Sequence, residues 1–286
     1  MKRWRLEYPV EVMARVLEVS RRGFYAWWGR PPSAHALEDE RLKVAITAAH
    51  VKTRETYGAK RLQTELQAEG FAVGRDRIAR LRRELGIGCK QKCTFKATTH
   101  SNHDGPVVEN LLGQCFDATV PNEVWHTDIT YIATGEGWLY LAGVKDQFTC
   151  EIVGYAMGAR MTQELVKQAL GGALRYQRPA PGLIHHSDRG SQYCALDYQR
   201  LLKQYGLLSS MSGKGNCYDN APMESVWGSL KTELVHHRRY ETRAEAEASI
   251  QEYIEIFYNR QRRHSRLGNV APAVFAQNFR KTQQAA

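Results

Sequence analysis

The sequence predicts an α/β domain that follows an all-α, basic N-terminal region. Over the first hundred residues, apolar side chains recur at helical spacing among many arginines and lysines. After Pro121 the pattern changes to runs rich in β-branched and aromatic residues, which alternate with amphipathic segments. A chain of 286 residues is long enough for two or three compact domains.

The composition is that of a basic globular protein. Lys and Arg number 40 against 30 Asp and Glu, for a net charge of +10, and 43% of the residues are hydrophobic. A positive balance favours a polyanionic partner without identifying one. No run approaches the ~20 apolar residues of a membrane span, and the N-terminus lacks the apolar stretch of a secretory signal. A cytoplasmic protein with no membrane partner is therefore expected.

The six cysteines are scattered and are expected to be free thiols. Cys89 and Cys93 stand four residues apart, but no second Cys/His pair follows at the spacing of a zinc finger. The sequence therefore does not favour a zinc site there.

Residues 1–32 are predicted to form a helix-turn-helix segment. Apolar residues at helical spacing mark one helix from about residue 9, and a second is predicted to start after Ser20. The stretch "RPPS" that follows cannot continue a helix and is predicted to be a linker.

Residues 36–96 are predicted to form a helical DNA-binding domain, with helices near 36–53, 58–70 and 74–88. On the third helix Ile78, Leu81 and Leu85 form an apolar stripe, and arginines occupy the other faces. A solvated basic surface would explain them, but three short helices ending in one so rich in arginine favour a DNA-reading helix. The candidate DNA contacts are Arg75, Arg77, Arg80, Arg82 and Arg83. Residues 97–120 are predicted to be a linker.

Residues 121–286 are predicted to form the α/β domain. Three β-rich runs, 123–134, 137–149 and 151–160, are joined by tight connections and predict an antiparallel meander. A helix (162–178), a strand (182–188), a helix (195–206), a short strand (207–212) and a further helix that includes 221–234 follow. This is the element order of the ribonuclease-H-like fold, in which the first strand is central and the fourth is its neighbour.

Three acids stand where this order allows them to meet. Asp128 lies within an apolar and aromatic strand, where an unpaired charge is costly to bury. Asp188 ends the fourth strand, and Glu224 lies in the first turn of the last helix. Carboxylates suit Mg²⁺ or Mn²⁺, and two such ions about 4 Å apart can promote phosphodiester displacement. Three clustered anions repel one another, so the metal-free site should be looser.

Four stretches carry a resemblance to a known family: "WHTDITYI", "HSDRGSQY", "SGKGNCYDNAPMESVWGSLKTEL" and "YNRQRRHSRLGNVAPAVF". Together they resemble the D-D-E transposases of the bacterial IS-three insertion-sequence family, relatives of retroviral integrases. The resemblance covers nearly the whole chain, with thirty-five residues between Asp188 and Glu224 and a basic residue, Lys231, seven after Glu224. It implies an integrase-type catalytic domain with a C-terminal helical extension. It also implies that Asp128, Asp188 and Glu224 are catalytic and bind two Mg²⁺ ions, for which Mn²⁺ can substitute.

The resemblance further implies a DNA transposase. The N-terminal helices would bind the terminal inverted repeats of the element, and the metal site would cut one strand and join the resulting 3′-OH to another phosphodiester. The expected partners are double-stranded DNA (terminal repeats and target), further copies of the chain on that DNA, and an upstream helix-turn-helix protein, separate or as a frameshift fusion. The expected location is the bacterial cytoplasm, at the nucleoid.

Other functions remain open at this stage. A catalytically silent DNA-binding protein derived from a transposase is the main alternative, and the intact triad argues against it. A ribonuclease or junction resolvase on the same fold would lack the basic residue after Glu224 and the N-terminal helices. A tyrosine recombinase could use Tyr258, whereas a rolling-circle nuclease needs a residue between two histidines, which His185 and His186 lack.

Several further residues allow two interpretations each or have a role that the sequence only suggests. Lys231 shares a helix face with Glu224 and is expected to meet a DNA phosphate, unless it is an ordinary solvated lysine. The loop 213–222, with Lys214, would suit a segment closing over DNA ends. Asn220 either caps the following helix or supports the site. His126 and His186 either support the metal ligands or are core histidines. The basic stretch 258–266 is either a DNA-backbone contact or a solvated helix end; its candidate contacts are Arg260, Arg262 and Arg263.

Overall fold

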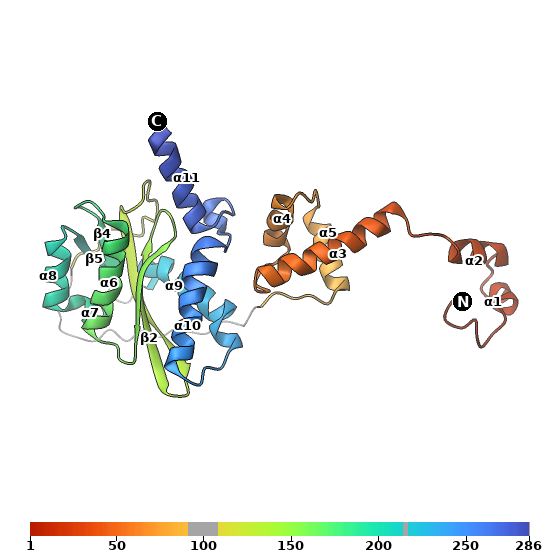
Figure 1. The fold of residues 1–286 in the computed structure, drawn as a ribbon, viewed down its shortest axis with the longest axis horizontal. Coiled ribbons are helices and arrows are strands. Elements are labelled where there is room, and N and C mark those ends of the chain that lie inside the picture. Colours follow the sequence, from red (N-terminus) through yellow and green to blue (C-terminus); the bar gives the residue numbers. More distant parts are fainter. Residues whose placement is uncertain (91–107, 214–216, 286) are drawn as a thin grey trace.

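The computed structural model describes residues 1–90, 108–213 and 217–285. They form three parts along the longest axis of the molecule: an N-terminal helix pair, a three-helix unit and an α/β domain (Figure 1). In the part of the chain that is described, no helix is both long and apolar enough to cross a membrane.

The helix pair has the predicted arrangement. Helix α1 (Val10–Val16) is followed by α2 (Arg21–Trp28), and the Ser20 hydroxyl accepts a hydrogen bond of 3.2 Å from the Gly23 amide. A serine at this position satisfies one of the amides that the first turn of a helix leaves unpaired. Ala14 and Phe24 are buried in this pair, whereas Trp27 is 56% exposed.

The three-helix unit consists of α3 (Ala34–Lys52), α4 (Ala59–Ala68) and α5 (Arg75–Glu84). Its core comprises Leu42, Ile46, Ala49, Tyr57, Leu62, Leu66, Val73, Ile78 and Leu81. The apolar stripe predicted for the third helix is thus buried at Ile78 and Leu81, and Leu85 packs against the same core. This stripe fixes which faces of α5 point away from α3 and α4.

The α/β domain is built on one mixed sheet of five strands in the order β3-β2-β1-β4-β5. The strands are β1 (Val124–Thr134), β2 (Gly137–Asp146), β3 (Ile152–Gly158), β4 (Ile184–Ser187) and β5 (Leu208–Met211). β1 is antiparallel to β2 and parallel to β4, and β4 is parallel to β5. The predicted ribonuclease-H-like topology is therefore confirmed, with β1 at the centre.

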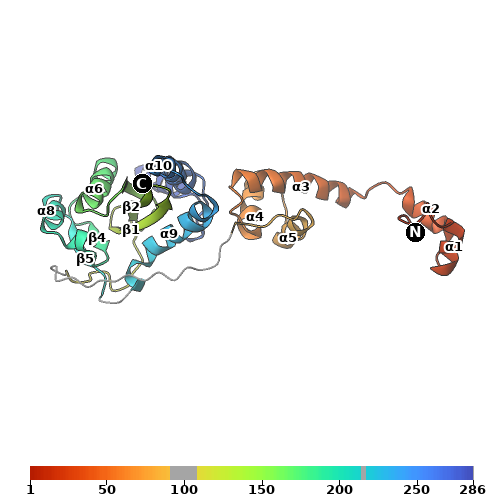
Figure 2. The same ribbon diagram turned by 90° about the horizontal axis from the view of Figure 1, so that it is seen from below.

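Helices cover both faces of this sheet (Figures 1 and 2). One face packs against α6 (Gln163–Gln177), α7 (Ser191–Cys194) and α8 (Leu196–Gln204). The other packs against α9 (Ala221–Glu233) and α10 (Arg243–Glu252). Gly154 of β3 allows α6 to approach closely, because a Cβ there would stand 2.4 Å from the Ala169 carbonyl oxygen.

Beyond α10 the chain is more elaborate than the helical extension that the sequence predicts. α10 runs directly into a π-helical segment, Tyr253–Tyr258, whose aromatic residues join the core on the α9 side of the sheet. Helix α11 (Pro272–Ala285) ends the described chain.

Part of the predicted linker lies against the α/β domain. The Leu111 amide donates to the Ser210 hydroxyl at 3.0 Å, the Asn110 side-chain amide donates to Asp219 at 3.0 Å, and Leu112 is buried. Residues 108–113 are therefore fixed to the sheet edge formed by β5.

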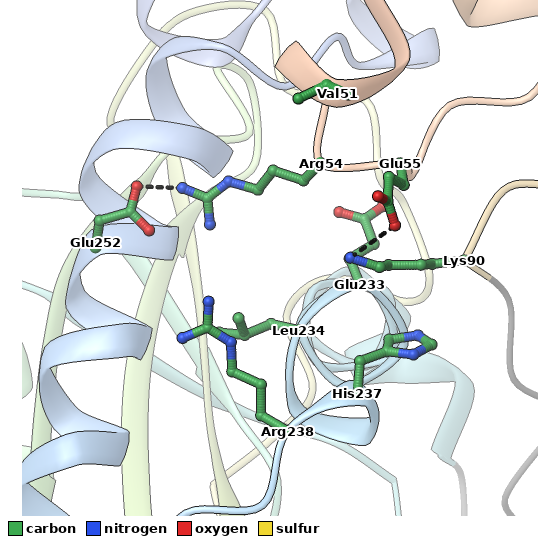
Figure 3. A pocket seen from close by; sticks show the side chains of 9 residues that line it. All are labelled: Val51, Arg54, Glu55, Lys90, Glu233, Leu234, His237, Arg238 and Glu252. Atoms are coloured by element: carbon green, nitrogen blue, oxygen red, sulfur yellow. Dashed lines mark hydrogen bonds and ion pairs between the residues drawn. The ribbon is translucent and has the colours of Figure 1, made fainter. Parts of the chain in front are cut away.

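The three-helix unit contacts the C-terminal part of the α/β domain. The Arg263 side chain donates to Glu65 at 2.6 Å, and its backbone amide donates to the Tyr57 hydroxyl at 2.6 Å. A polar cavity of about 320 Å³ lies at this junction, where Arg54 turns toward Glu252 (Figure 3). Its lining residues are Val51, Arg54, Glu55, Lys90, Glu233, Leu234, His237, Arg238 and Glu252.

Candidate active site

Asp128 lies on the central strand and faces α9. It is paired across β1 and β2 with Gly143. One carboxylate oxygen accepts from the Ile129 amide at 2.8 Å and the other accepts from the Trp227 indole N–H at 3.1 Å. A Cβ at Gly143 would stand 2.6 Å from the Trp227 ring, so the absence of a side chain at Gly143 lets the indole reach Asp128.

Asp188 lies beside Asp128 because of the register of two parallel strands. His126 of β1 is paired with His186 of β4, and each aspartate follows its histidine by two residues. Neighbouring strands are about 4.8 Å apart, and residues two apart share a face, so both carboxylates emerge at the same level. One Asp188 oxygen accepts from the Gly190 amide at 2.9 Å, which fixes the turn after β4.

Glu224 comes from the first turn of α9. Pro222 lies in this turn, as the sequence predicts. The buried side of the helix includes Met223, Val226 and Leu230, which leaves Glu224 exposed. The buried Lys145 amine donates to the Pro222 carbonyl at 3.1 Å and so ties the turn to β2.

The three acids influence one another electrostatically. Burial, together with the charges of Asp188 and Glu224, raises the pKa of Asp128 to about 7. The pKa of Glu224 is also raised, by partial loss of solvent. Within the described residues, no three His, Cys, Asp or Glu side chains stand close enough to hold one metal ion. The expectation of a looser metal-free site stays a prediction.

The two histidines lie beneath the aspartates, inside the sheet. Both are fully buried, and their rings make a T-shaped contact at 5.5 Å. His126 is hydrogen-bonded to Gln147 at 2.6 Å, and His186 is hydrogen-bonded to Ser210 and Ser212 at 2.9 and 3.2 Å. Burial lowers their pKa values to about 3 and about 4, so both are neutral at pH 7. Of the two expectations, this placement favours core histidines.

The residues before α9 tie it to β1. Asn220 makes no side-chain cap to α9; its amide donates to the Thr127 carbonyl at 3.1 Å instead. The buried Asp219 accepts from the Gly213 amide at 2.7 Å. Lys214, an expected DNA contact, lies outside the described residues, so its role stays a prediction.

Lys231 is near the site, as its spacing from Glu224 predicts. Its ammonium nitrogen lies 5.2 Å from the centre of the Tyr131 ring, within the range of a cation–π interaction. Burial lowers the pKa of Lys231, while the charge of Asp128 opposes that shift. The ammonium therefore lies within the electrostatic reach of Asp128.

The five arginines of α5 differ in what they contact. Arg77 and Arg80 both bind Asp39 of α3, at 2.8 and 2.7 Å, so their guanidinium groups hold α5 to α3. Arg75 pairs with the adjacent Asp76 at 3.3 Å and is exposed. Arg83 is also exposed, whereas Arg82 is half-buried.

The structure contradicts the prediction that Arg262 contacts DNA. Arg262 is only 5% exposed, and its guanidinium binds both carboxylate oxygens of Glu233 at 2.8 to 3.0 Å. Arg263 faces Glu65 of the three-helix unit. The stretch is thus neither a uniform DNA contact nor a solvated helix end, because two of its arginines neutralise acids within the protein. Arg260 is exposed.

Burial also bears on two alternative functions. Tyr258 is 1% exposed, which keeps its hydroxyl from attacking a DNA phosphate as a tyrosine recombinase would require. His185 is 1% exposed, and its ring is hydrogen-bonded to the Tyr198 hydroxyl at 3.1 Å.

The sequence analysis missed two residues that position the site. The indole N–H of Trp227 holds Asp128, and its position three residues after Glu224 on the same helix is the signal that could have identified it. Lys145 was not singled out. A lysine in an otherwise apolar strand is the corresponding signal, because a buried amine needs a partner.

β1 lies at the centre of the sheet, and the acids lie on β1, after β4 and at the start of α9. This arrangement is that of an integrase-type core, the class that carries out polynucleotidyl transfer. Comparison with protein families agrees: residues 118–217 and 224–279 match the Integrase core domain, and residues 37–93 match the HTH-like domain. The chain is 41% identical over 271 residues to the transposase InsF for insertion sequence IS3A of Escherichia coli, covering 94% of each. The chain belongs to the IS3 family of insertion-sequence transposases.

The chain is also similar to a second relative and to a solved structure. The insertion element IS600 uncharacterized 31 kDa protein of Shigella sonnei is 63% identical over 267 residues, covering 93% of this chain and 98% of that protein. Among solved structures, the catalytic core domain of BIV integrase matches 57% of this chain and 99% of its own, with 15% identity and a TM-score of 0.44.

Proposed function

We propose that Asp128, Asp188 and Glu224 together bind divalent metal and catalyse the cutting and joining of DNA strands at the ends of an insertion element. The observation that carries this proposal is that the pKa of Asp128 is raised first by burial and then by the charges of Asp188 and Glu224. Mutually repelling carboxylates gathered around a central strand are costly without a cation to neutralise them. No other role of these residues accounts for that cost.

The donor set fits Mg²⁺, with Mn²⁺ as a substitute, because carboxylate oxygens are the hard ligands that both ions prefer. Asp128, Asp188 and Glu224 would hold two ions. When bound, such a pair supplies charge stabilisation to the attacking and leaving oxygens of a phosphodiester. The protein's own contribution is positioning: the Ile129 amide and the Trp227 N–H fix the orientation of Asp128, and the Gly190 amide fixes Asp188.

The helical parts are proposed to bind the terminal repeats. Arg75 and Arg83 are exposed on α5, and Arg260 is exposed on the α/β domain, so these are the contacts we retain for DNA phosphates. Arg77 and Arg80 would act indirectly, by holding α5 to α3. The chain would act as an oligomer on DNA, alone or with an upstream helix-turn-helix partner, in the bacterial cytoplasm at the nucleoid.

The proposal is tested with purified protein, labelled element ends and Mg²⁺. Wild type should nick the end and then join the 3′-OH to a second strand. Asp188→Asn and Glu224→Gln should bind the ends with unchanged affinity and lose both steps. Asp197→Asn, an exposed acid on α8, is the matched control and should retain both. Wild-type binding without cutting would identify a catalytically silent DNA-binding protein, and nicking by a triple variant of the triad would sink the metal site.

A further inference from the structure

Two large aromatic side chains are half exposed beside the triad. Tyr131 of β1 and Trp138 of β2 are each 50% exposed, and their rings make a T-shaped contact at 4.9 Å. Tyr131 is paired with Tyr140 across the two strands, so Trp138 is its diagonal neighbour on the same face. We call Tyr131 and Trp138 the aromatic pair.

The aromatic pair lies near the catalytic acids along β1 but leaves the opposite face of the sheet, because Asp128 is paired with Gly143, which faces α9, whereas Tyr131 is paired with Tyr140, which packs toward α6. β1 and α9 run side by side, with Trp227 hydrogen-bonded to Asp128 and the Lys231 ammonium over the Tyr131 ring. Tyr131 follows Asp128 by three residues, which is about 10 Å along a strand. A stacked DNA strand advances about 3.4 Å per nucleotide, so this distance spans about three nucleotides.

The edge of β1 beside the aromatic pair has no strand partner over a short stretch only, because Asn220 binds the Thr127 carbonyl at one end and Thr134 is bridged to Tyr240 at the other. β4 pairs with β1 at Val124, Trp125 and His126, so along the described chain the strand has no β4 partner from Thr127 onward. A polynucleotide strand lying on the triad would have to pass across this short free stretch of the edge to reach the aromatic pair on the other face. It would meet one ammonium group and two aromatic rings, which are the groups that single-stranded nucleic acid contacts through its phosphates and bases.

We propose that the aromatic pair stacks on a base of the DNA strand that is being cut, within about three nucleotides of the scissile phosphate, while Lys231 binds a phosphate of the same strand. This inference rests on the proposed function and names a subsite for it. The alternative is a purely structural role, in which the aromatic pair only stabilises the β1–β2 hairpin. The occupant we commit to is the element end, because cleavage of the end involves no target DNA.

Stacking can be measured without cleavage. Element ends would carry the fluorescent base 2-aminopurine at one of the three positions on either side of the scissile phosphate, and Ca²⁺ would replace Mg²⁺ to prevent cutting. Wild type should quench the fluorescence at one position, and Tyr131→Ala and Trp138→Ala should abolish that quenching. Tyr205→Ala, a 48% exposed tyrosine at the end of α8, should quench as wild type does.

Cleavage in Mg²⁺ then separates a stacking role from a structural one. Each alanine variant should cleave about 5- to 150-fold less efficiently at subsaturating DNA, the range expected for loss of one base–aromatic stack. Wild type on an end that is abasic at the stacked position should lose the same factor. The two losses should not multiply in the combination, because both remove one contact. Tyr131→Phe should retain cleavage, while Tyr131→Leu should not.

The proposal is overturned if both alanine variants quench and cleave as wild type does. It is also overturned if the loss of cleavage caused by the alanine variants and the loss caused by an abasic end multiply at every position. The aromatic pair would then act by stabilising the hairpin. A loss confined to joining, with end cleavage intact, would assign the pair to target DNA instead. Failure of wild type to cleave contradicts the proposed function, but the Ca²⁺ fluorescence result still decides whether a base stacks here.

Discussion

Replacing Arg262 by methionine is expected to destabilise the α/β domain strongly without weakening DNA contacts directly. The guanidinium is almost fully buried and binds both oxygens of Glu233, which is itself 9% exposed. Tyr253 donates a further hydrogen bond of 2.7 Å to the same carboxylate. Methionine keeps much of the apolar stem but leaves the Glu233 charge without its main partner.

The magnitude follows from that geometry. Removing one member of a buried ion pair costs about 3–5 kcal/mol. For a domain of roughly 150–250 residues each kcal/mol lowers the melting temperature by about 2–4 °C, so the expected loss is about 6–20 °C. Glu233→Gln combined with Arg262→Met should recover a large part of this, because no charge is left unpaired and the amide oxygen still accepts from Tyr253.

Thermal unfolding of the two single variants and the double variant measures this coupling. Arg260→Met is the matched control, because that arginine is exposed. It should melt as wild type does and, if it contacts a phosphate, reduce the salt slope of DNA binding by about one. A variant Arg262→Met that melts within a degree of wild type and instead shows the reduced salt slope would refute the reasoning.

Three further predictions follow from single contacts. Gly143→Ala should cost about 1–3 kcal/mol and impair cleavage, because its Cβ would press on the Trp227 ring; calorimetry and a cleavage assay check both. The raised pKa of Asp128 means that the metal-free fold binds this proton more tightly than the unfolded chain does. Urea unfolding in EDTA should therefore show stability falling from pH 4 to about pH 7, and Asp128→Asn should flatten this fall. Arg83→Ala should weaken end binding in a gel-shift assay at unchanged melting temperature, whereas Arg77→Ala should lower the melting temperature by detaching α5 from Asp39.

The order of elements could be predicted from the sequence because it depends on local patterns. The assignment of the three acids depends on that order and on the family resemblance, and stays a prediction. Neighbouring residues determine the strand and helix periodicity, the cap at Ser20 and the change of pattern after Pro121. The proximity of Asp188 to Asp128 then follows from topology, since β4 is parallel to β1 and ends beside the part of β1 that carries Asp128.

Partners that are distant in sequence could not be predicted in this way. Arg262 and Arg260 belong to the same basic stretch, yet one is buried against Glu233 and the other is exposed. The difference depends on the π-helical segment before them, which the hydrophobic periodicity of the sequence does not predict. Trp227 and Lys145 position the site through an indole and an amine whose partners are fixed only by the packing of α9 on the sheet.

Exchange of a metal ligand for a softer one tests most directly whether the triad binds the catalytic metal. Asp188→Cys places a thiolate where a carboxylate would hold Mg²⁺, and thiolates bind that hard ion poorly. We expect the variant to lose end cleavage in Mg²⁺ and to regain part of it in Mn²⁺, while Asp188→Ser regains none in either ion. Wild-type cleavage by the cysteine variant in Mg²⁺, or equal recovery by the serine variant in Mn²⁺, would contradict a metal-binding role for Asp188.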